Sequence, residues 1–257
     1  MKIKIILLLI ALIVANSVVF AQTAKEISDK ATDVIDFEAM EMTLTLKIYD
    51  AKDRERIRQV TTASKKFGEI NKTIMKFTSP ADVRGTAMLI YDYENKDDDM
   101  WIYMPAIRKI RRIVSSEKGK NFMGSEFTNA DMSMPNLDDF DYRILSSETY
   151  NGNSCWKIET VCKNEDIEDE NGYSKKIALI EKGTYLCHKV EFYDFSGDLF
   201  KVQFIEQYKK QSNGKYFSFY MKMENKQNGR KSVMTIDKFQ LGSALTENTF
   251  TPAMLEK

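Results

Sequence analysis

Recurring dipeptides that end in glycine divide the second half of the sequence into short segments. They are Asn151-Gly152, Asn171-Gly172, Lys182-Gly183, Ser196-Gly197, Asn213-Gly214 and Asn228-Gly229. Asn-Gly is the strongest short signal for a β-hairpin, because both residues tolerate positive φ angles. Between these turns apolar and polar side chains alternate, as along Phe217, Phe219, Met221 and Met223. The pattern predicts an antiparallel meander of strands.

The first part of the chain predicts one helix followed by a further strand. Residues 22–37 have apolar side chains at helical spacing, and Thr23 with Glu26 forms a Thr-x-x-Glu capping box at the start. The alternation from Met42 to Ile48 then predicts a half-buried strand. No Pro-rich or Gly/Ser-rich linker interrupts the sequence, so we expect one domain over residues 22–257.

A sheet with so many consecutive hairpins closes, curls or stacks. One face of the predicted strands is aromatic and rich in methionine, whereas the other is rich in lysine and glutamate. We therefore expect an α+β fold that is mainly antiparallel β, with the sheet curled around its apolar face. The sequence leaves open whether a packed core or a ligand cavity fills that space.

The N-terminal residues have the organisation of a signal peptide. Lys2 and Lys4 are followed by an unbroken apolar run to Val14, and small residues end the segment at Ala21. We expect residues 1–21 to be removed by cleavage before Gln22. No cysteine follows the apolar run, so the mature chain is predicted to be a periplasmic protein and not a lipoprotein.

Few residues in the sequence can support catalysis or metal binding. His188 is the only histidine, and its place on a strand with apolar neighbours predicts a structural role. No Gly-x-Ser-x-Gly elbow, Cys-x-x-Cys pair or glycine-rich phosphate loop is present, and no pair of carboxylates is singled out for hydrolysis. The acidic run Glu165–Glu170 lacks the spacing of a calcium loop and predicts a solvated hairpin loop. We expect no catalytic residues, no metal and no cofactor.

The charges and cysteines constrain the partners and the redox state. The 38 basic and 38 acidic residues balance, which disfavours nucleic acid as a partner. Cys155 and Cys162 have an odd separation and face opposite sides of one strand. In a meander Cys187 lies two strands away, roughly 9.5 Å, beyond the roughly 7 Å limit for a disulfide. We expect three free thiols.

The central segment carries the most specific motifs. In order they are Gly85-Thr86-Ala87-x-Leu89, Trp101-x-Tyr103-x-Pro105, Arg111-Arg112-Ile113, and Phe122-Met123-Gly124-Ser125-x-Phe127-Thr128-x-x-Asp131. This series resembles the outer-membrane lipoprotein-sorting branch of the LolA-like superfamily. The resemblance implies a half-open curved β-barrel, with an N-terminal helix and short lid helices over an apolar cavity that receives acyl chains. The motif positions carried over from the family are Gly85, Trp101, Tyr103, Pro105, Arg111, Arg112, Phe122, Gly124, Ser125 and Asp131.

Methionines and aromatic residues are the candidate lipid contacts. Thioether side chains adapt to irregular apolar partners, and several methionines lie between Met100 and Met134. We interpret residues 122–134 as a flap with short helices begun by Thr128 and Asn136, although these methionines also suit gaps under a long connection. The candidates are Leu44, Leu46, Met88, Trp101, Tyr103, Met104, Phe122, Met123, Phe127, Met132, Met134, Phe219 and Met221.

Arg108, Lys109, Arg111 and Arg112 form the only dense basic cluster of the sequence. Anionic lipid head groups attract such clusters, so these residues are candidates for contact with a head group or a partner. A solvated strand face is the alternative.

The resulting hypothesis is a periplasmic carrier for lipids or the acyl chains of lipoproteins, in transport towards the outer membrane. An inner-membrane transporter and an outer-membrane acceptor are its possible partners, and we expect a monomer. The alternative is an accessory subunit of a lipid or lipoprotein exporter that carries no cargo.

Overall fold

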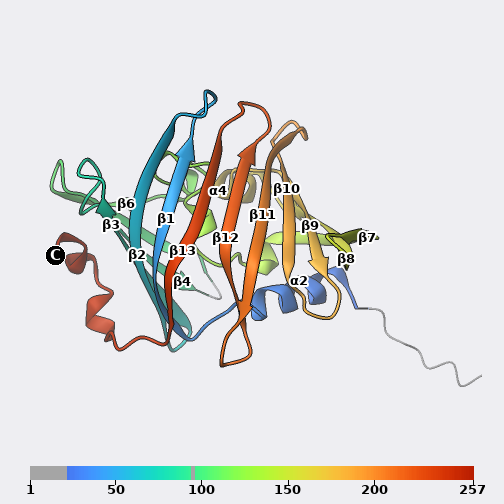
Figure 1. The fold of residues 1–257 in the computed structure, drawn as a ribbon, viewed down its shortest axis with the longest axis horizontal. Coiled ribbons are helices and arrows are strands. Elements are labelled where there is room, and N and C mark those ends of the chain that lie inside the picture. The colour runs from blue at the N-terminus through green and yellow to red at the C-terminus, as the bar shows by residue number, and fades with distance from the viewer. Residues whose placement is uncertain (1–21, 94–95) are drawn as a thin grey trace, which may run out of the picture.

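Thirteen antiparallel strands form one continuous curved sheet in the computed structural model, which describes residues 22–93 and 96–257 (Figure 1). The predicted signal peptide lies outside the described residues. The strands are β1 (Ala39–Tyr49), β2 (Glu55–Phe67), β3 (Ile70–Ser79), β4 (Ala87–Tyr93), β5 (Asp99–Met104), β6 (Lys109–Ile113), β7 (Phe140–Tyr150), β8 (Asn153–Cys162), β9 (Lys175–Glu181), β10 (Cys187–Tyr193), β11 (Leu199–Lys210), β12 (Tyr216–Asn225) and β13 (Lys231–Leu241).

Two meanders meet in the middle of the sheet. The strand order is β6-β5-β4-β3-β2-β1-β13-β12-β11-β10-β9-β8-β7, so the first and last strands are neighbours. Their register pairs Leu46 with Met234 and continues from Met40 to Tyr49 with one irregularity after Thr43. Strands β6 and β7 form the two open edges, although they follow one another in the sequence. The connection between them therefore has to cross from one edge of the sheet to the other.

Helix α2 (Ala24–Asp33) crosses one end of the curled sheet (Figure 1). The predicted capping box is present, with Thr23 and Glu26 each accepting a hydrogen bond from the backbone of the other. At one end the Tyr185 hydroxyl donates to Gln22 Oε1 at 3.2 Å. At the other, the Tyr216 amide donates to the carbonyl oxygen of Val34 at 2.8 Å. The helix is shorter than the predicted range 22–37.

Short helices occupy the connection between β6 and β7 and the one between β8 and β9. The first connection contains α3 (Ser115–Lys118) and the 3-10 turns η1 (Phe122–Gly124), η2 (Ala130–Met132) and η3 (Leu137–Asp139). The second contains α4 (Glu165–Asn171), which packs against α3. Lys118 Nζ donates to Glu170 at 3.1 Å and joins these two helices. They lie with the 122–134 segment on the concave side of the sheet.

Both faces of the sheet bury apolar side chains. The concave face carries the larger cluster, which includes Ile27, Leu46, Ile90 and Met100. On the convex face of β2–β5 a smaller cluster forms around Phe250, which is fully buried. The second cluster exists because the C-terminal segment, with η4 (Glu247–Thr249) and η5 (Pro252–Glu256), folds back over these strands (Figure 1).

The structure corrects one of the predicted hairpins. Residues Glu165–Asn171 form helix α4, and Gly172 ends it in the left-handed region at φ 77°. The predicted solvated hairpin loop over the acidic run is therefore wrong. Asn164 caps the helix by accepting from the Ile167 amide at 3.0 Å. Acidic side chains in the first turn also favour a helix, because their negative charge is attracted to the positive end of the helix dipole.

The histidine and cysteine predictions agree with the structure. His188 lies beside Glu181, with its Nε2 atom 2.7 Å from Glu181 Oε2, so its ring has a polar partner. Cys155, Cys162 and Cys187 are free thiols. Burial raises the pKa of Cys162 and of Cys187 to about 12, which keeps these two thiols protonated and unreactive.

The contact between α3 and α4 predicts a steric effect at Gly119. A Cβ atom there would lie 2.7 Å from the backbone nitrogen of Gly172, although the φ of Gly119, −69°, suits any residue. We expect Gly119→Ala to lower the free energy of unfolding by about 1–3 kcal/mol, as overpacking does. Urea denaturation measures the loss. Ser116→Ala, an exposed change in α3, is the control, and equal stabilities of the two variants would contradict the prediction.

Candidate functional site

A cavity of about 210 Å³ lies between the concave face of the sheet and the segment that covers it. It is larger than the cavity of about 150 Å³ that suffices to bind benzene in an engineered apolar core. Strands β1–β4, β12 and β13 form its wall, and residues 35–37, Phe122 and residues 131–134 form its cover. Seven methionines line it: Met40, Met42, Met75, Met132, Met134, Met221 and Met234.

One wall of this cavity is polar. Thr62 and Ser64 of β2, Asn71 and Thr73 of β3, and Asp92 of β4 all line it. The Thr73 hydroxyl donates to Ser64 Oγ at 2.9 Å, and the Ser64 hydroxyl donates to Asn71 Oδ1 at 2.9 Å. Adjacent strands thus present a connected row of polar groups to the interior.

Asp92 holds the cover on the cavity. Its Oδ2 atom accepts a hydrogen bond from the Met134 amide at 3.0 Å. Burial, together with the neighbouring carboxylate of Asp98, raises the pKa of Asp92 to about 7. Burial also raises the pKa of Asp98, and Ser133 of the same segment opposes that shift. Asp92 is therefore the carboxylate that anchors the backbone closing this end of the cavity.

A buried carboxylate fixes the adjacent part of the cover. Glu126 is 1% exposed, and its Oε1 atom forms an ion pair with Arg230 Nε at 2.9 Å. Its Oε2 atom accepts from Asn225 Nδ2 at 2.9 Å, and its amide donates to Ser232 Oγ at 2.9 Å. Lys201 Nζ donates to its carbonyl oxygen at 2.8 Å. Residues 122–128 are thus tied to β11, β12 and β13.

The turn within residues 122–128 explains several of the family motif positions. Ser125 is fully buried, and its hydroxyl donates to the carbonyl oxygen of Phe122 at 2.7 Å. Gly124 adopts a positive φ of 76°, which glycine accommodates without strain. Its carbonyl oxygen accepts from Arg230 Nη2 at 2.9 Å. These motif residues shape and anchor the cover rather than line the cavity.

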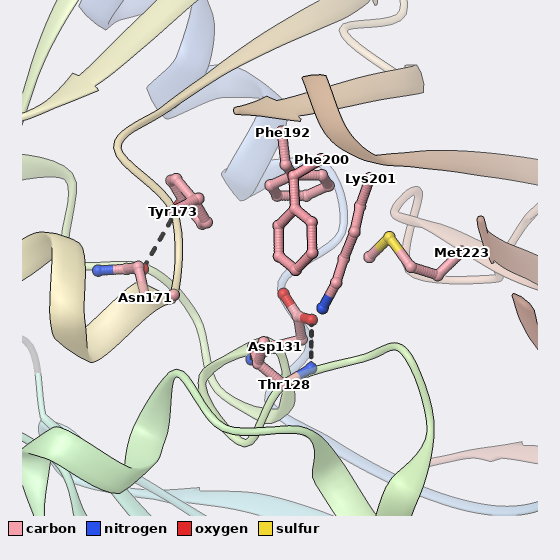
Figure 2. A pocket seen from close by; sticks show the side chains of 9 residues that line it. Thr128, Asp131, Asn171, Tyr173, Phe192, Phe200, Lys201 and Met223 are labelled. Atoms are coloured by element: carbon pink, nitrogen blue, oxygen red, sulfur yellow. Dashed lines mark hydrogen bonds between the residues drawn. The ribbon is translucent and has the colours of Figure 1, made fainter. Parts of the chain in front are cut away.

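Asp131 lies where the large cavity meets a small second pocket. Its Oδ2 atom accepts from the Thr128 amide at 2.7 Å, and Thr128 Oγ1 accepts from the Asp131 amide at 3.1 Å. Thr128 therefore caps this turn with its side chain, although Asn129 is the residue that directly precedes η2. Figure 2 shows the Asp131 carboxylate and the Lys201 ammonium pointing toward one another. Burial lowers the pKa of Lys201, and Asp131 opposes that shift.

The structure brings five of the predicted lipid-contact residues to the cavity. They are Leu44, Phe122, Met132, Met134 and Met221. Leu44 is buried in the wall and Phe122 is buried in the cover, whereas the three methionines are half-buried. The alternation of strand β1 indicated Leu44, and the motifs of the central segment indicated Phe122.

The other predicted contacts lie elsewhere. Leu46, Met88 and Phe127 are buried in the concave core, and Met123 packs against it without lining the cavity. Phe219 lies in an aromatic cluster with Phe217 and Phe239, and Met104 is half-buried at the end of β5. Trp101 and Tyr103 are on the convex face, packed against the cluster around Phe250. The alternation separates these two from Met100 and Ile102, but it does not say which face the C-terminal segment covers.

The predicted basic cluster lies on the edge strand β6 and the turn before it. Arg111 pairs with Glu117 at 2.6 Å, and Arg112 pairs with Asp99. Arg108 and Lys109 are exposed, and no ion pair holds either of them in the described part of the chain. The structure separates the cluster into a paired half and an unpaired half.

Sequence reasoning missed Asp92, Thr62 and Glu126. Asp92 shares the concave face of β4 with Met88 and Ile90, so the period of two places a carboxylate on the apolar face. A carboxylate on the apolar face of a strand was the sequence signal that could have identified Asp92. The role of Glu126 had no such signal, because its partners Asn225, Arg230 and Ser232 are remote in the sequence.

Neither a metal site nor a membrane span is evident in the described residues. Within residues 22–93 and 96–257, no group of three or more histidine, cysteine or acidic side chains is arranged to hold a metal ion. Over the same ranges no helix has the length and apolar character needed to cross a bilayer. The site is therefore defined by its shape, its methionines and its polar wall.

The buried position of Glu126 predicts a large loss of stability when it is removed. We expect Glu126→Ala to lower the free energy of unfolding by about 1–3 kcal/mol, because the buried Asn225 amide then loses its acceptor and Arg230 loses its ion-pair partner. Thermal and urea denaturation followed by circular dichroism measure this loss. Glu69→Ala, in the exposed turn between β2 and β3, is the control. A loss of stability no larger than that of the control would show that the Glu126 contacts do not stabilise the fold.

The raised pKa of Asp92 predicts a pH-dependent stability. Its folded pKa of about 7 lies above the usual 3.8, so the folded state binds the extra proton and stability falls as pH rises from about 4 to about 7. An asparagine at this position cannot ionise. We therefore expect the stability of Asp92→Asn relative to the natural protein to increase between pH of about 5 and about 8, measured by urea denaturation. Asp166→Asn, at an exposed position in α4, should show no such change, and a constant difference for Asp92→Asn would refute the prediction.

Solved structures with the same fold include proteins described as lipoprotein-sorting domains. A protein described as an outer membrane lipoprotein-sorting protein domain, from Vibrio parahaemolyticus, is 28% identical with a TM-score of 0.84, and the match covers 91% of this chain and 98% of that one. A DUF1329 family protein from Desulfovibrio piger is 27% identical with a TM-score of 0.82, covering 91% and 100%. A LolA superfamily protein from Nitrosomonas europaea is 22% identical with a TM-score of 0.70, covering 90% and 98%. The last likeness concerns the fold alone.

Sequence comparisons agree with this relationship. A family model described as uncharacterized protein-like matches residues 69–257, which is more than half of the chain. No curated protein matches the sequence. With the motifs, the open curved sheet and the structural likeness, this match identifies the family. The chain belongs to the DUF1329 family, with the LolA-like fold of outer-membrane lipoprotein-sorting domains.

Proposed function

We propose that this protein is a periplasmic carrier that binds lipids, or the acyl chains of lipoproteins, for transport towards the outer membrane. The observation that carries the proposal is the methionine-lined cavity of about 210 Å³ on the concave face of the sheet. The names of its structural relatives support the direction of transport, and the predicted signal peptide supports the compartment.

The chemistry of the cavity favours binding over catalysis. Burying each CH₂ group of an acyl chain contributes about 0.8 kcal/mol, and flexible thioethers adapt to chains of different shape. His188 has Glu181 as its partner and does not line the cavity. The carboxylates Asp92 and Asp131 accept backbone hydrogen bonds that hold the cover in place. They are thus explained by structure and need no catalytic role.

The cover and the edge of the sheet supply the remaining parts of the proposal. The Met134 amide is held by Asp92, and residues 132–134 have fewer buried polar contacts than residues 122–128. We propose that this short segment, rather than the whole range 122–134, moves to admit a chain. Arg108 and Lys109 remain candidates for contact with head groups or a membrane partner. Near an anionic surface each basic residue contributes about 1 kcal/mol.

Native mass spectrometry with lipid extraction tests the carrier function. The mature protein, residues 22–257, is purified from a bacterial periplasm without detergent and then incubated with phospholipid vesicles. We expect a bound mass that extracts as a lipid or an acylated peptide. A protein that stays free of ligand would overturn the proposal and favour the accessory subunit of an exporter.

Two predicted methionines provide a matched pair of variants. Met221 lines the cavity and Met104 does not, although both are half-buried on strands. We expect Met221→Trp to fill the cavity and to reduce the bound lipid about tenfold, with a stability cost of about 1–3 kcal/mol. Met104→Trp should retain the lipid. Equal retention by both variants in native mass spectra would place the lipid outside this cavity.

A further inference from the structure

The two walls of the cavity differ in chemistry. Strands β1, β12 and β13 present Met42, Leu44, Met221, Met234 and Ile236. Strands β2–β4 instead present hydroxyl, amide and carboxylate groups beside Val60 and Met75. An acyl chain needs only the apolar groups, so the polar row is unexplained by apolar packing alone.

One group in the polar row is without a partner among residues 22–93 and 96–257. The Thr62 hydroxyl is buried and makes no hydrogen bond with these residues, and Thr62 is only 4% exposed. Leaving a buried hydroxyl unpaired costs free energy, about 1–3 kcal/mol in proteins. Thr62 lines the cavity between Met42 of β1 and Met75 of β3, its partners in the strand register, whereas Asn71 lies further along β3 beside Asp92. The cavity therefore offers hydrogen-bonding capacity that the described residues do not satisfy.

The charges that line the cavity are all negative. They are Asp36, Asp92 and Asp131, and neither lysine nor arginine lines it. Lys66 forms an ion pair with Asp36 at 2.6 Å, and its charge lowers the pKa of Asp92 less than burial raises it. Asp131 faces Lys201 across the small pocket (Figure 2). Among the described residues, no lysine or arginine forms an ion pair with Asp92. Its Oδ2 atom accepts from the Met134 amide, which leaves the other carboxylate oxygen for a further donor.

We propose that the cavity takes the polar end of an amphiphile as well as its chain, and that this polar end is an uncharged or cationic hydrogen-bond donor. Long-chain alcohols and amines have this chemistry, whereas fatty acids do not. The donor meets Asp92, beside which Asn71 lies in the strand register, and the chain lies against the methionines that flank Thr62. The proposal rests on the carrier function and specifies the ligand class of the same cavity.

Electrostatics separates the two ligand classes. A carboxylate brought beside an ionised Asp92 meets a like charge in a medium of low dielectric, where repulsion is stronger than in water. An ammonium group in the same place is attracted, and a hydroxyl donates to the carboxylate at little electrostatic cost. Burial already raises the pKa of Asp92, which is the expected response of a carboxyl that lacks a close cation.

Displacement of a neutral fluorescent probe by ligands of equal chain length tests the proposal. The mature protein is loaded with N-phenyl-1-naphthylamine at pH of about 8, and decan-1-ol, decylamine and decanoate are titrated separately. We expect the alcohol and the amine to displace the probe at concentrations about tenfold lower than decanoate. Asp92→Asn should abolish the preference for the amine over decanoate, while Asp166→Asn, an exposed carboxylate in α4, should preserve it.

Thr62→Val gives a second, independent readout. The Thr62 hydroxyl makes no hydrogen bond with the described residues and lies among the methionines that contact the chain. Thr62→Val should therefore leave stability unchanged or raised, and it should preserve the preference for the amine over decanoate; loss of that preference would place the polar end at Thr62 rather than at Asp92. If decanoate competes as well as the amine in the natural protein, the ligand class is wrong and the carrier function stands. If neither the probe nor any of the three ligands binds, the carrier function itself fails.

Discussion

The position of β6 and β7 at opposite edges of one sheet is the constraint on which the site depends. These strands follow one another in the sequence, yet eleven strands separate them in the sheet order. The chain between them has to traverse the concave face, and it does so as residues 114–139. Because the sheet is curved and its concave face is apolar, the traversing segment becomes the cover of that face. The cavity is the space that this cover and α2 do not fill.

The cover is held by polar contacts of unequal strength. Glu126 makes buried contacts with three strands at the sheet's centre, and breaking such a network leaves charges without partners in a low dielectric. Met134 depends instead on Asp92, whose pKa is raised by burial and by the neighbouring Asp98. Residues 122–128 thus have more buried polar contacts than residues 132–134. This difference is the basis for the proposal that residues 132–134 move while residues 122–128 stay in place.

The sequence predicted the strands better than it predicted the interior. Alternation and glycine-containing turns identified the meander, and the capping box identified the start of α2. Asn171-Gly172 misled, because a glycine in the left-handed region ends a helix as well as it makes a hairpin. Trp101 and Tyr103 were assigned to the cavity because the family motif includes them. They lie on the convex face, where an apolar cover comes from Phe250, far away in the sequence.

The missing part of the prediction was the polar half of the site, and the reason is physical. A threonine or an asparagine on a strand has no signature that separates a solvated face from a cavity wall. Only the packing of the cover over β2–β4 removes Thr62 from water and leaves its hydroxyl without a partner.

A carrier must bind its cargo and also release it, and an amphipathic cavity meets both requirements. Apolar burial alone grows with every CH₂ group, so a purely apolar site holds long chains too firmly to hand them on. Hydrogen bonds to a polar wall add orientation with little net free energy, because the ligand exchanges them for bonds to water. Methionines spread the apolar contact over adaptable side chains. In this protein Asp92 lines the polar wall and accepts the Met134 amide of the cover, so under the proposed carrier function ligand binding and closure of the cavity act on one carboxylate. A donor on the ligand that competes with the Met134 amide for that carboxylate would loosen the cover as it binds, which couples entry of the cargo to the opening needed for its exit.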